Sequence, residues 1–127
     1  MEKKIVLTAL IFGFFAITLG AFAAHGLKKF LTTDQLSSFE VGTKYLMYHA
    51  LFLLFLGTTK MLLPEQKSSI YWLTVAGTAF FSGSIFLLTT SPSLGVNFKF
   101  LGPITPIGGV LLLGAWAVLF ILILKKL

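Results

Sequence analysis

The sequence has no cysteine, no arginine and only four acidic residues among 127. The absence of cysteine excludes disulfides, thiolate metal sites, iron–sulfur clusters and a cysteine nucleophile. Charged residues make up 11% of the chain, whereas soluble domains average roughly 25%, so the chain has too few to cover a water-facing surface. Because 57% of the residues are apolar, we expect the chain to lie largely in lipid. Its length predicts a single domain over residues 1–127.

The basic residues are ten lysines, and the formal net charge is +6. In a soluble protein such a charge would suggest a nucleic-acid partner. Here the lysines lie between long apolar runs and form no single basic patch. The charge therefore indicates membrane topology, with the lipid bilayer as the partner and no role for nucleic acid.

Four apolar runs are long enough to cross a bilayer, which takes about 20 residues. We expect Pro64 and Pro92 to end the second and third helices, and Thr105 with Pro106 to cap and begin the fourth. The sequence thus predicts an all-α membrane protein, a four-helix transmembrane bundle. Its spans cover residues 5–24, 45–63, 69–90 and 105–124.

The lysines beside these runs predict the orientation. Four spans place both termini on one side, which then carries six lysines against four on the other. The positive-inside rule favours cytoplasmic termini, in a multi-pass protein of the cytoplasmic (inner) membrane. The first run also imitates a signal peptide, with Lys3 and Lys4 before it and Ala21-Phe22-Ala23 as a cleavage pattern. The run is longer than a signal core, which favours a retained helix.

The connection over residues 25–44 has two interpretations. Thr32 or Thr33 is a suitable cap for a short interfacial helix on the outer membrane surface, with Leu36 and Phe39 on one face. The alternative is an exposed loop.

Small residues recur in three of the four runs, where they allow helices to approach closely in lipid. They predict contacts within a compact antiparallel bundle, or alternatively within a homo-oligomer or with a membrane-protein partner. We expect Gly20 in particular to support a neighbouring helix. The predicted packing residues are Ala16, Gly20, Ala24, Ala79 and Gly83.

Polar residues at membrane depth are costly, and they indicate either function or internal hydrogen bonds. In the predicted topology several gather in the outer half of the membrane, near backbone N–H groups that glycines leave uncovered at the start of the last span. If they share a pocket, His49 and Ser84 are energetically coupled. The structural alternatives are histidines at the headgroup level and serines bonded to helix carbonyls. The candidate pocket residues are His25, His49, Ser82, Ser84, Thr105, Gly108 and Gly109.

These residues give little support to catalysis or to a cofactor. Two histidines lack a third metal ligand, and haem ligation normally places both well inside a bundle, whereas His25 lies at an edge. The four acidic residues fall in flanks and loops, so none is available to orient a serine–histidine pair. We expect no enzyme activity, no cofactor and no metal.

Four short segments carry a further signal: GAFAAHGL at 20–27, GTKYLMYHAL at 42–51, FSGS at 81–84, and TPIGG at 105–109 with GAW at 114–116. In order and spacing they resemble domain-of-unknown-function family 423, small four-helix bacterial inner-membrane proteins related to the eukaryotic transmembrane protein 256. Ala23 and Leu46 stand where that family commonly has glycine and glutamine, and the loop over 91–102 is longer. The resemblance implies fold, topology and membrane location, and adds Pro106 to the residues of interest.

Two functions follow as hypotheses. The first is a non-enzymatic accessory or membrane-stabilising protein that acts through protein or lipid contacts. The alternative is a small-ligand binding or transport protein with an outer-leaflet polar pocket. It would work as a homo-oligomer, because one chain of four helices is thin for a transporter.

Overall fold

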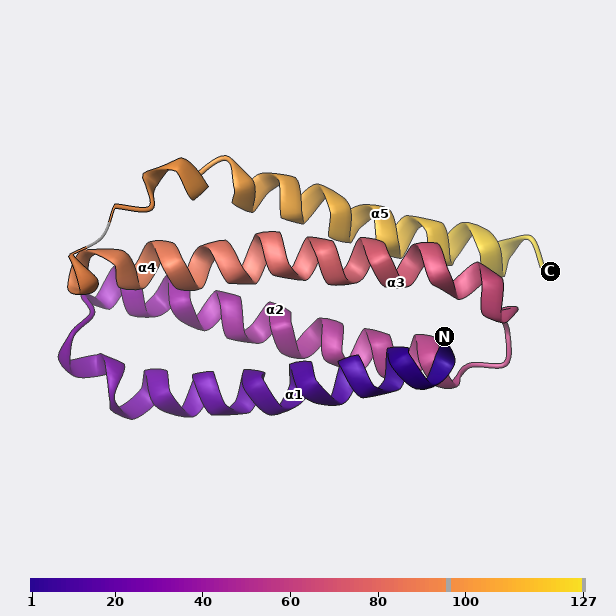
Figure 1. Cartoon of the computed structure of the whole chain (residues 1–127), viewed down its shortest axis with the longest axis horizontal. Helices are drawn as coiled ribbons and strands as arrows, with labels where there is room; N and C mark the ends of the chain where they lie inside the picture. Colours follow the sequence, from indigo (N-terminus) through magenta and orange to yellow (C-terminus); the bar gives the residue numbers. More distant parts are fainter. Residues whose placement is uncertain (96, 127) are drawn as a thin grey trace.

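The structure, a computed structural model, describes residues 1–95 and 97–126, and every regular element in these ranges is helical (Figure 1). A π-helical turn, η2, joins α3 to α4 without a break, so these three elements form one long rod. The elements are α1 (Glu2–His25), η1 (Leu27–Lys29), α2 (Thr33–Thr58), α3 (Pro64–Thr78), η2 (Ala79–Gly83), α4 (Ser84–Leu94), η3 (Lys99–Leu101) and α5 (Ile104–Leu124).

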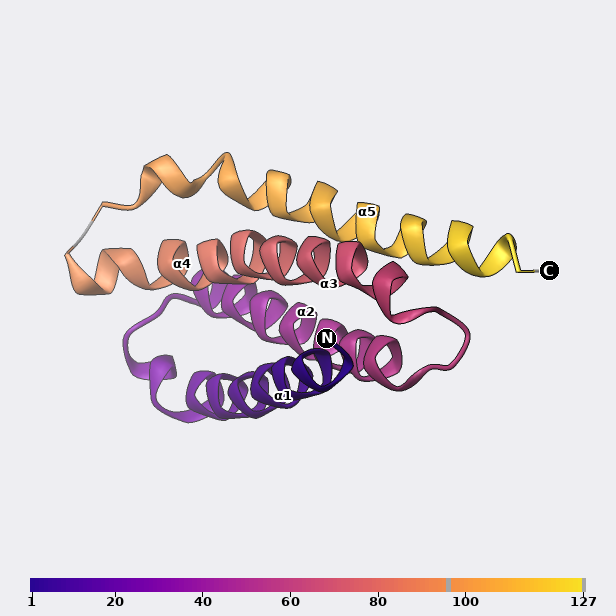
Figure 2. The same ribbon diagram turned by 45° about the vertical axis from the view of Figure 1, so that its right-hand side comes forward.

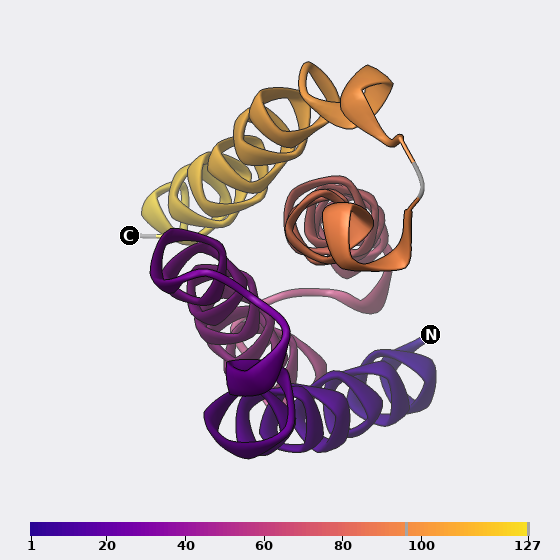
Figure 3. The same ribbon diagram turned by 90° about the vertical axis from the view of Figure 1, so that its left-hand side faces the viewer.

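The rods follow one another in antiparallel order. α1 packs along α2, α2 packs on the α3–α4 rod, and α5 packs on α3 and η2 (Figures 1 and 2). Seen along the rods, α1 and α5 stand at the two ends of a curved row (Figure 3). Both termini lie at the same end of the molecule. This arrangement confirms the predicted all-helical class.

Three rods are long and apolar enough to cross a membrane: Glu2–His25, Pro64–Ser93 and Lys99–Leu124. They contain the predicted spans 5–24, 69–90 and 105–124. α2 is not among them, because its first three turns carry polar and charged side chains.

The predicted start and end of the second helix are wrong. The expected interfacial helix or loop and the expected span over 45–63 are one continuous helix, Thr33–Thr58. Thr32 begins it with a capping box: its hydroxyl accepts from the backbone N–H of Gln35 (3.1 Å), and the Gln35 side chain accepts from the backbone N–H of Thr32 (3.0 Å). The helix ends at Thr58, five residues before the predicted end at Leu63, because the backbone becomes extended at Thr59.

Pro64 and Pro92 also act differently from the prediction. Pro64 does not close a helix but opens α3. Pro92 lies inside α4. It has no backbone N–H to donate to the carbonyl of Leu88, and the hydroxyl of Ser91 donates to that carbonyl instead (3.0 Å). α4 ends at Gly95, whose positive φ of 70° suits glycine.

The fourth rod begins earlier than predicted. α5 starts at Ile104 after Pro103, so Thr105 lies inside the first turn. Its hydroxyl bonds to Ser84 rather than capping its own helix, which corrects its expected role.

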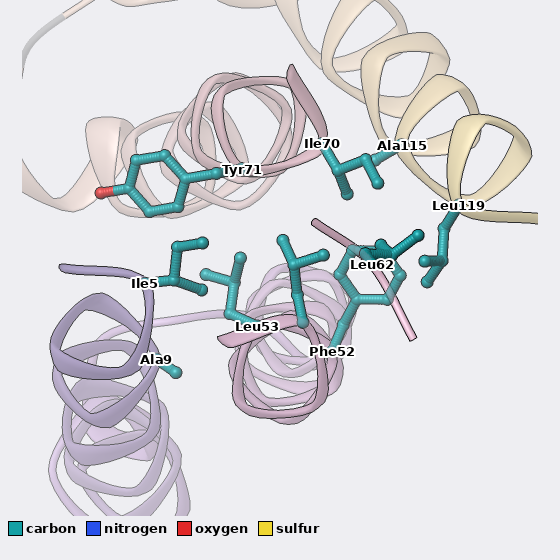
Figure 4. Packing of buried hydrophobic residues seen from close by; sticks show 10 residues of the cluster. Ile5, Ala9, Phe52, Leu53, Leu62, Ile70, Tyr71, Ala115 and Leu119 are labelled. Carbon is teal, nitrogen blue, oxygen red and sulfur yellow. The ribbon is translucent and has the colours of Figure 1, made fainter. Parts of the chain in front are cut away.

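The main apolar cluster lies at the end of the molecule that carries the termini (Figure 4). It joins the start of α1 to the second half of α2, the start of α3 and the second half of α5. The buried members are Ile5, Ala9, Phe52, Leu53, Leu56, Leu62, Ile70, Tyr71, Ala115 and Leu119. Side chains from all four rods therefore meet in one cluster.

A buried lysine lies beside this cluster and was not predicted. The ammonium of Lys67 has no solvent exposure, and it pairs with the carboxylate of Glu2 and donates to the carbonyl of Thr59 (2.7 Å). A buried charge requires such partners, since leaving it unpaired is costly. Nearby, the hydroxyl of Tyr71 bonds to that of Thr8 (2.8 Å). These contacts hold the starts of α1 and α3 together.

The small residues that pack are mostly not the predicted ones. Ala16 is buried, but Ala24 and Ala79 are exposed, and a Cβ added at Gly20 or Gly83 would meet nothing within 4 Å. The expectation that a helix of the same chain rests on Gly20 is therefore wrong. Gly20 and Ala24 turn away from α2, because the buried face of α1 is formed by Ile5, Ala9, Ala16 and Ala23. The tight glycine contacts are at Gly42, Gly57, Gly77 and Gly108.

Gly108 has the tightest surroundings. It lies against the backbone of α3 and η2, so that an added Cβ would clash with the backbone nitrogen of Phe81 and stand 2.8 Å from the carbonyl oxygen of Gly77. Backbone atoms cannot swing aside as a side chain can. α5 can therefore pack this closely on α3 and η2 only if residue 108 is glycine.

We predict that Gly108→Ala lowers the free energy of unfolding by about 2 kcal/mol, the usual cost of overpacking. Gly109→Ala is the matched control, because its Cβ would only touch the ring of Phe81 at 3.8 Å. Chemical unfolding in mixed micelles measures both. Equal stability of the two variants would contradict the backbone contact.

Candidate functional site around His49

His49 lies near the middle of α2 and is 4% exposed. It stands sixteen residues after the helix begins, about 24 Å along its axis. It therefore lies more than four turns inside its helix rather than one, because the helix starts at Thr33 rather than Tyr45.

Both ring nitrogens of His49 have partners within the chain. Nδ1 lies 2.8 Å from the carbonyl oxygen of Tyr45, and Nε2 lies 3.1 Å from the indole nitrogen of Trp116 on α5. A carbonyl only accepts and an indole N–H only donates. The imidazole is therefore neutral, with its proton on Nδ1. Its two hydrogen bonds leave no nitrogen free to ligate a metal.

The serines expected beside His49 bond elsewhere. Ser82 donates to the carbonyl of Gly42 on α2 (2.9 Å). Ser84 donates to the carbonyl of Phe81 (3.0 Å), so its oxygen accepts from the hydroxyl of Thr105. Ser82 thus ties the rod to α2, whereas Ser84 ties it to α5. Neither bonds directly to His49, so no direct hydrogen bond supports the expected coupling between His49 and Ser84.

The other candidate residues are also separated. His25 is exposed in the last turn of α1. The space beside Gly108 is occupied by the backbone of η2, so only Gly109 lies near His49. The predicted seven-residue pocket is therefore not formed. Within the described ranges, no three histidine or acidic side chains lie close enough to hold a metal ion.

His49 and Gly109 instead line a groove between α2 and α5, which we call the α2–α5 groove. It has a volume of about 410 Å³. Along α5 it runs from Pro106 to Trp116, about 15 Å at the rise of a helix. Its lining residues are Tyr45, His49, Phe81, Pro106, Gly109, Val110, Leu112, Leu113 and Trp116.

The outer side of the groove is apolar and open. Val110, Leu113 and Trp116 are 66%, 70% and 51% exposed. The deepest polar group is the imidazole of His49, which is already bonded to Trp116. The arrangement offers mainly hydrocarbon and aromatic surface, together with the hydroxyl of Tyr45.

Sequence reasoning missed Trp116. Tryptophan in membrane proteins is usually found at the interfaces, but this one lies in the middle of an apolar run. A buried indole N–H needs an acceptor, and His49 provides it. The unusual depth of Trp116 was the available signal.

A family model for DUF423, a protein of unknown function, matches residues 19–109. The chain belongs to the DUF423 family. The match covers the last two turns of α1, all of α2, the α3–α4 rod and the first turns of α5, and thus every predicted pocket residue. Trp116 lies beyond the matched segment.

Curated relatives of this DUF423 chain are named UPF0382 membrane proteins. One from Staphylococcus aureus is 41% identical over 110 residues, 87% of this chain and 86% of its own. YwdK of Bacillus subtilis is 32% identical over 98% of this chain and 99% of its own. One from Schizosaccharomyces pombe is 33% identical over 86% of this chain and 92% of its own. No solved structure matches. With its apolar rods, the chain is a membrane protein of a family found in bacteria and eukaryotes.

We predict that His49 is coupled to Trp116 and not to Ser84. A double-mutant cycle of His49→Ala with Trp116→Phe should give an interaction of about 0.6 kcal/mol, the mean for hydrogen bonds between membrane helices. The cycle of His49→Ala with Ser84→Ala should be additive. Unfolding in mixed micelles measures both cycles, and coupling in the second alone would contradict the assigned hydrogen bond.

Proposed function

We propose that this chain is a non-enzymatic protein of the cytoplasmic membrane that crosses the bilayer four times and acts through contacts with lipid. In this proposal the α2–α5 groove holds the hydrocarbon chain of a lipid. The observation that carries it is that the buried polar side chains near the groove have their hydrogen-bond partners within the chain. His49, Ser82 and Ser84 all bond within the chain, while the open side of the groove is apolar.

The connections support α2 as the fourth span. Glu2 pairs with Lys67, so the starts of α1 and α3 lie at one end of the molecule. α1 runs to the other end, and α2 returns from it along α1 (Figure 1). Its 26 residues cover about 39 Å. If α1 and α3 cross the membrane in the same direction, α2 must cross it in the opposite one.

The lysines support cytoplasmic termini. The end that carries the termini has Lys3, Lys4, Lys60, Lys67, Lys125 and Lys126, against four lysines at the other end. Lysine lies mainly on the cytoplasmic side of short membrane-flanking segments.

We predict that alkaline phosphatase fused after Leu31 is active in the periplasm of a bacterial host, and that fusions after Met61 and after Lys126 are inactive. The enzyme folds only outside the cytoplasm, because it requires disulfides. Activity after both Leu31 and Met61 would show that α2 stays on the outer surface. Activity after Lys126 would contradict cytoplasmic termini.

A lipid chain fits the groove better than a polar ligand does. To bond to the imidazole of His49, a polar ligand would have to displace Trp116 from it. A hydrocarbon chain needs no donor, and an elongated groove that opens beside exposed Val110 and Leu113 gives it access from the bilayer. The geometry therefore favours lipid contact over transport of a polar solute.

The two tryptophans allow a direct test. Trp116 lies in the groove, and Trp72 lies near the lysine-rich end with the ammonium of Lys4 over its ring at 4.5 Å. In a Trp72→Phe background, we predict that brominated phosphatidylcholine added to detergent-purified protein quenches Trp116 saturably, at about one lipid per chain. Gly109→Leu should abolish most of this quenching, because it fills the groove.

Trp116→Phe is the control background, since it reports on Trp72 alone. Equal quenching of Trp72 and Trp116 would indicate general contact with lipid and would overturn the bound chain. Quenching of Trp116 that survives Gly109→Leu would place the lipid outside the groove.

A further inference from the structure

A second cavity lies at the opposite end of the molecule from the termini. It is enclosed by the end of α1, the segment around η1 and the end of α4, and we call it the η1–α4 cavity. Its volume is about 420 Å³, within the range of small-molecule sites. It shares no residue with the α2–α5 groove. Its lining residues are Phe22, Leu27, Phe30, Leu31, Thr90 and Ser93.

The interior of this cavity suits hydrocarbon. Four of its six lining residues are apolar. The hydroxyl of Thr90 donates to the carbonyl of Phe86 (2.7 Å), and that of Ser93 donates to the carbonyl of Phe30 (2.9 Å). Both hydroxyl protons are thus used within the chain. The second bond also fastens the segment around η1 to α4.

The segment that borders the cavity carries two lysines. Lys28 and Lys29 lie between the lining residues Leu27 and Phe30, and both side chains are exposed. In the part of the chain that the structure describes, neither ammonium lies within ion-pair distance of a carboxylate. They follow the end of α1, which is a candidate membrane span, so they lie at the level of lipid headgroups.

We propose that the η1–α4 cavity binds an anionic phospholipid. One acyl chain enters the cavity between Phe22 and the end of α4, and the phosphate group lies against Lys28 and Lys29. Apolar walls alone would accept any lipid, whereas the two adjacent cations favour a headgroup that carries net negative charge. Free phosphate would gain nothing from the apolar interior. The site goes beyond the lipid contact proposed for the α2–α5 groove, since it selects the headgroup.

Native mass spectrometry of the detergent-purified full chain tests this site. Phosphatidylglycerol and phosphatidylcholine with the same acyl chains are titrated separately, and the dissociation constant of the first bound lipid is compared. We expect phosphatidylglycerol to bind more tightly. Lys28→Gln with Lys29→Gln should weaken its binding roughly tenfold or more, since each lysine near an anionic surface contributes measurably to affinity.

Lys125→Gln with Lys126→Gln is the matched control. It removes two adjacent, exposed lysines from the other end of the molecule. An equal loss in both double variants, or no preference for phosphatidylglycerol in the unaltered protein, would overturn the proposal. Both pairs are exposed, so folding is unaffected, and elution as a single species with an unchanged melting temperature verifies this.

Thr90→Phe tests the cavity itself. The larger ring fills the space that the acyl chain would take, so phosphatidylglycerol binding should fall as far as in the lysine variant. Unchanged binding would mean recognition of the headgroup without the cavity and would overturn the proposed pose. Gly109→Leu should leave phosphatidylglycerol binding intact, which separates failure of this site from failure of the groove.

Discussion

The position of α5 depends on the backbone contact between Gly108 and the π turn η2. A residue with a side chain at 108 would push α5 away from α3, and the contacts along its length would be lost with it. Thr105 reaches Ser84 one turn before this contact, and Trp116 reaches His49 two turns after it. A π turn widens the helix locally and is often found at functional sites. Here it provides the surface on which α5 rests, and the groove lies directly beside it.

The hydrogen bonds of the polar side chains explain how so apolar a chain acquires a defined structure. Lipid provides little driving force for helices to associate, so close packing and interhelical hydrogen bonds must do so. Ser82 joins the long rod to α2, and Ser84 joins it to α5. Each bond stabilises one helix pair, and together they occupy the groups that would otherwise be available to a ligand. Polar residues at depth are therefore consistent with a structural role in this DUF423 member.

Hydropathy was sufficient to predict three of the rods, because twenty uninterrupted apolar residues permit few other structures in a membrane. It failed at the start of α2, where a capping box at Thr32 begins a helix whose first turns are polar. It failed again at Pro92, because the hydroxyl of Ser91 replaces the missing backbone donor. The site could not be predicted, since which residues face each other depends on helix rotation. The contact of Trp116 with His49, 67 positions away, follows from the packing of Gly108. The place of Trp116 in the middle of an apolar run indicates a buried partner but not which residue it is.

The pair formed by Glu2 and Lys67 joins residues 65 positions apart. During synthesis the carboxylate of Glu2 therefore lacks this partner until two further connections have been made and α3 has followed. Before that moment the carboxylate and the ammonium both remain hydrated at the membrane surface, where each is stable alone. When the ion pair forms, the side chain of Lys67 is buried and the start of α1 is held against the start of α3. The first helix thus gains its last polar contact only after the third has been made, so a helix pair of α1 and α2 alone is an incomplete assembly.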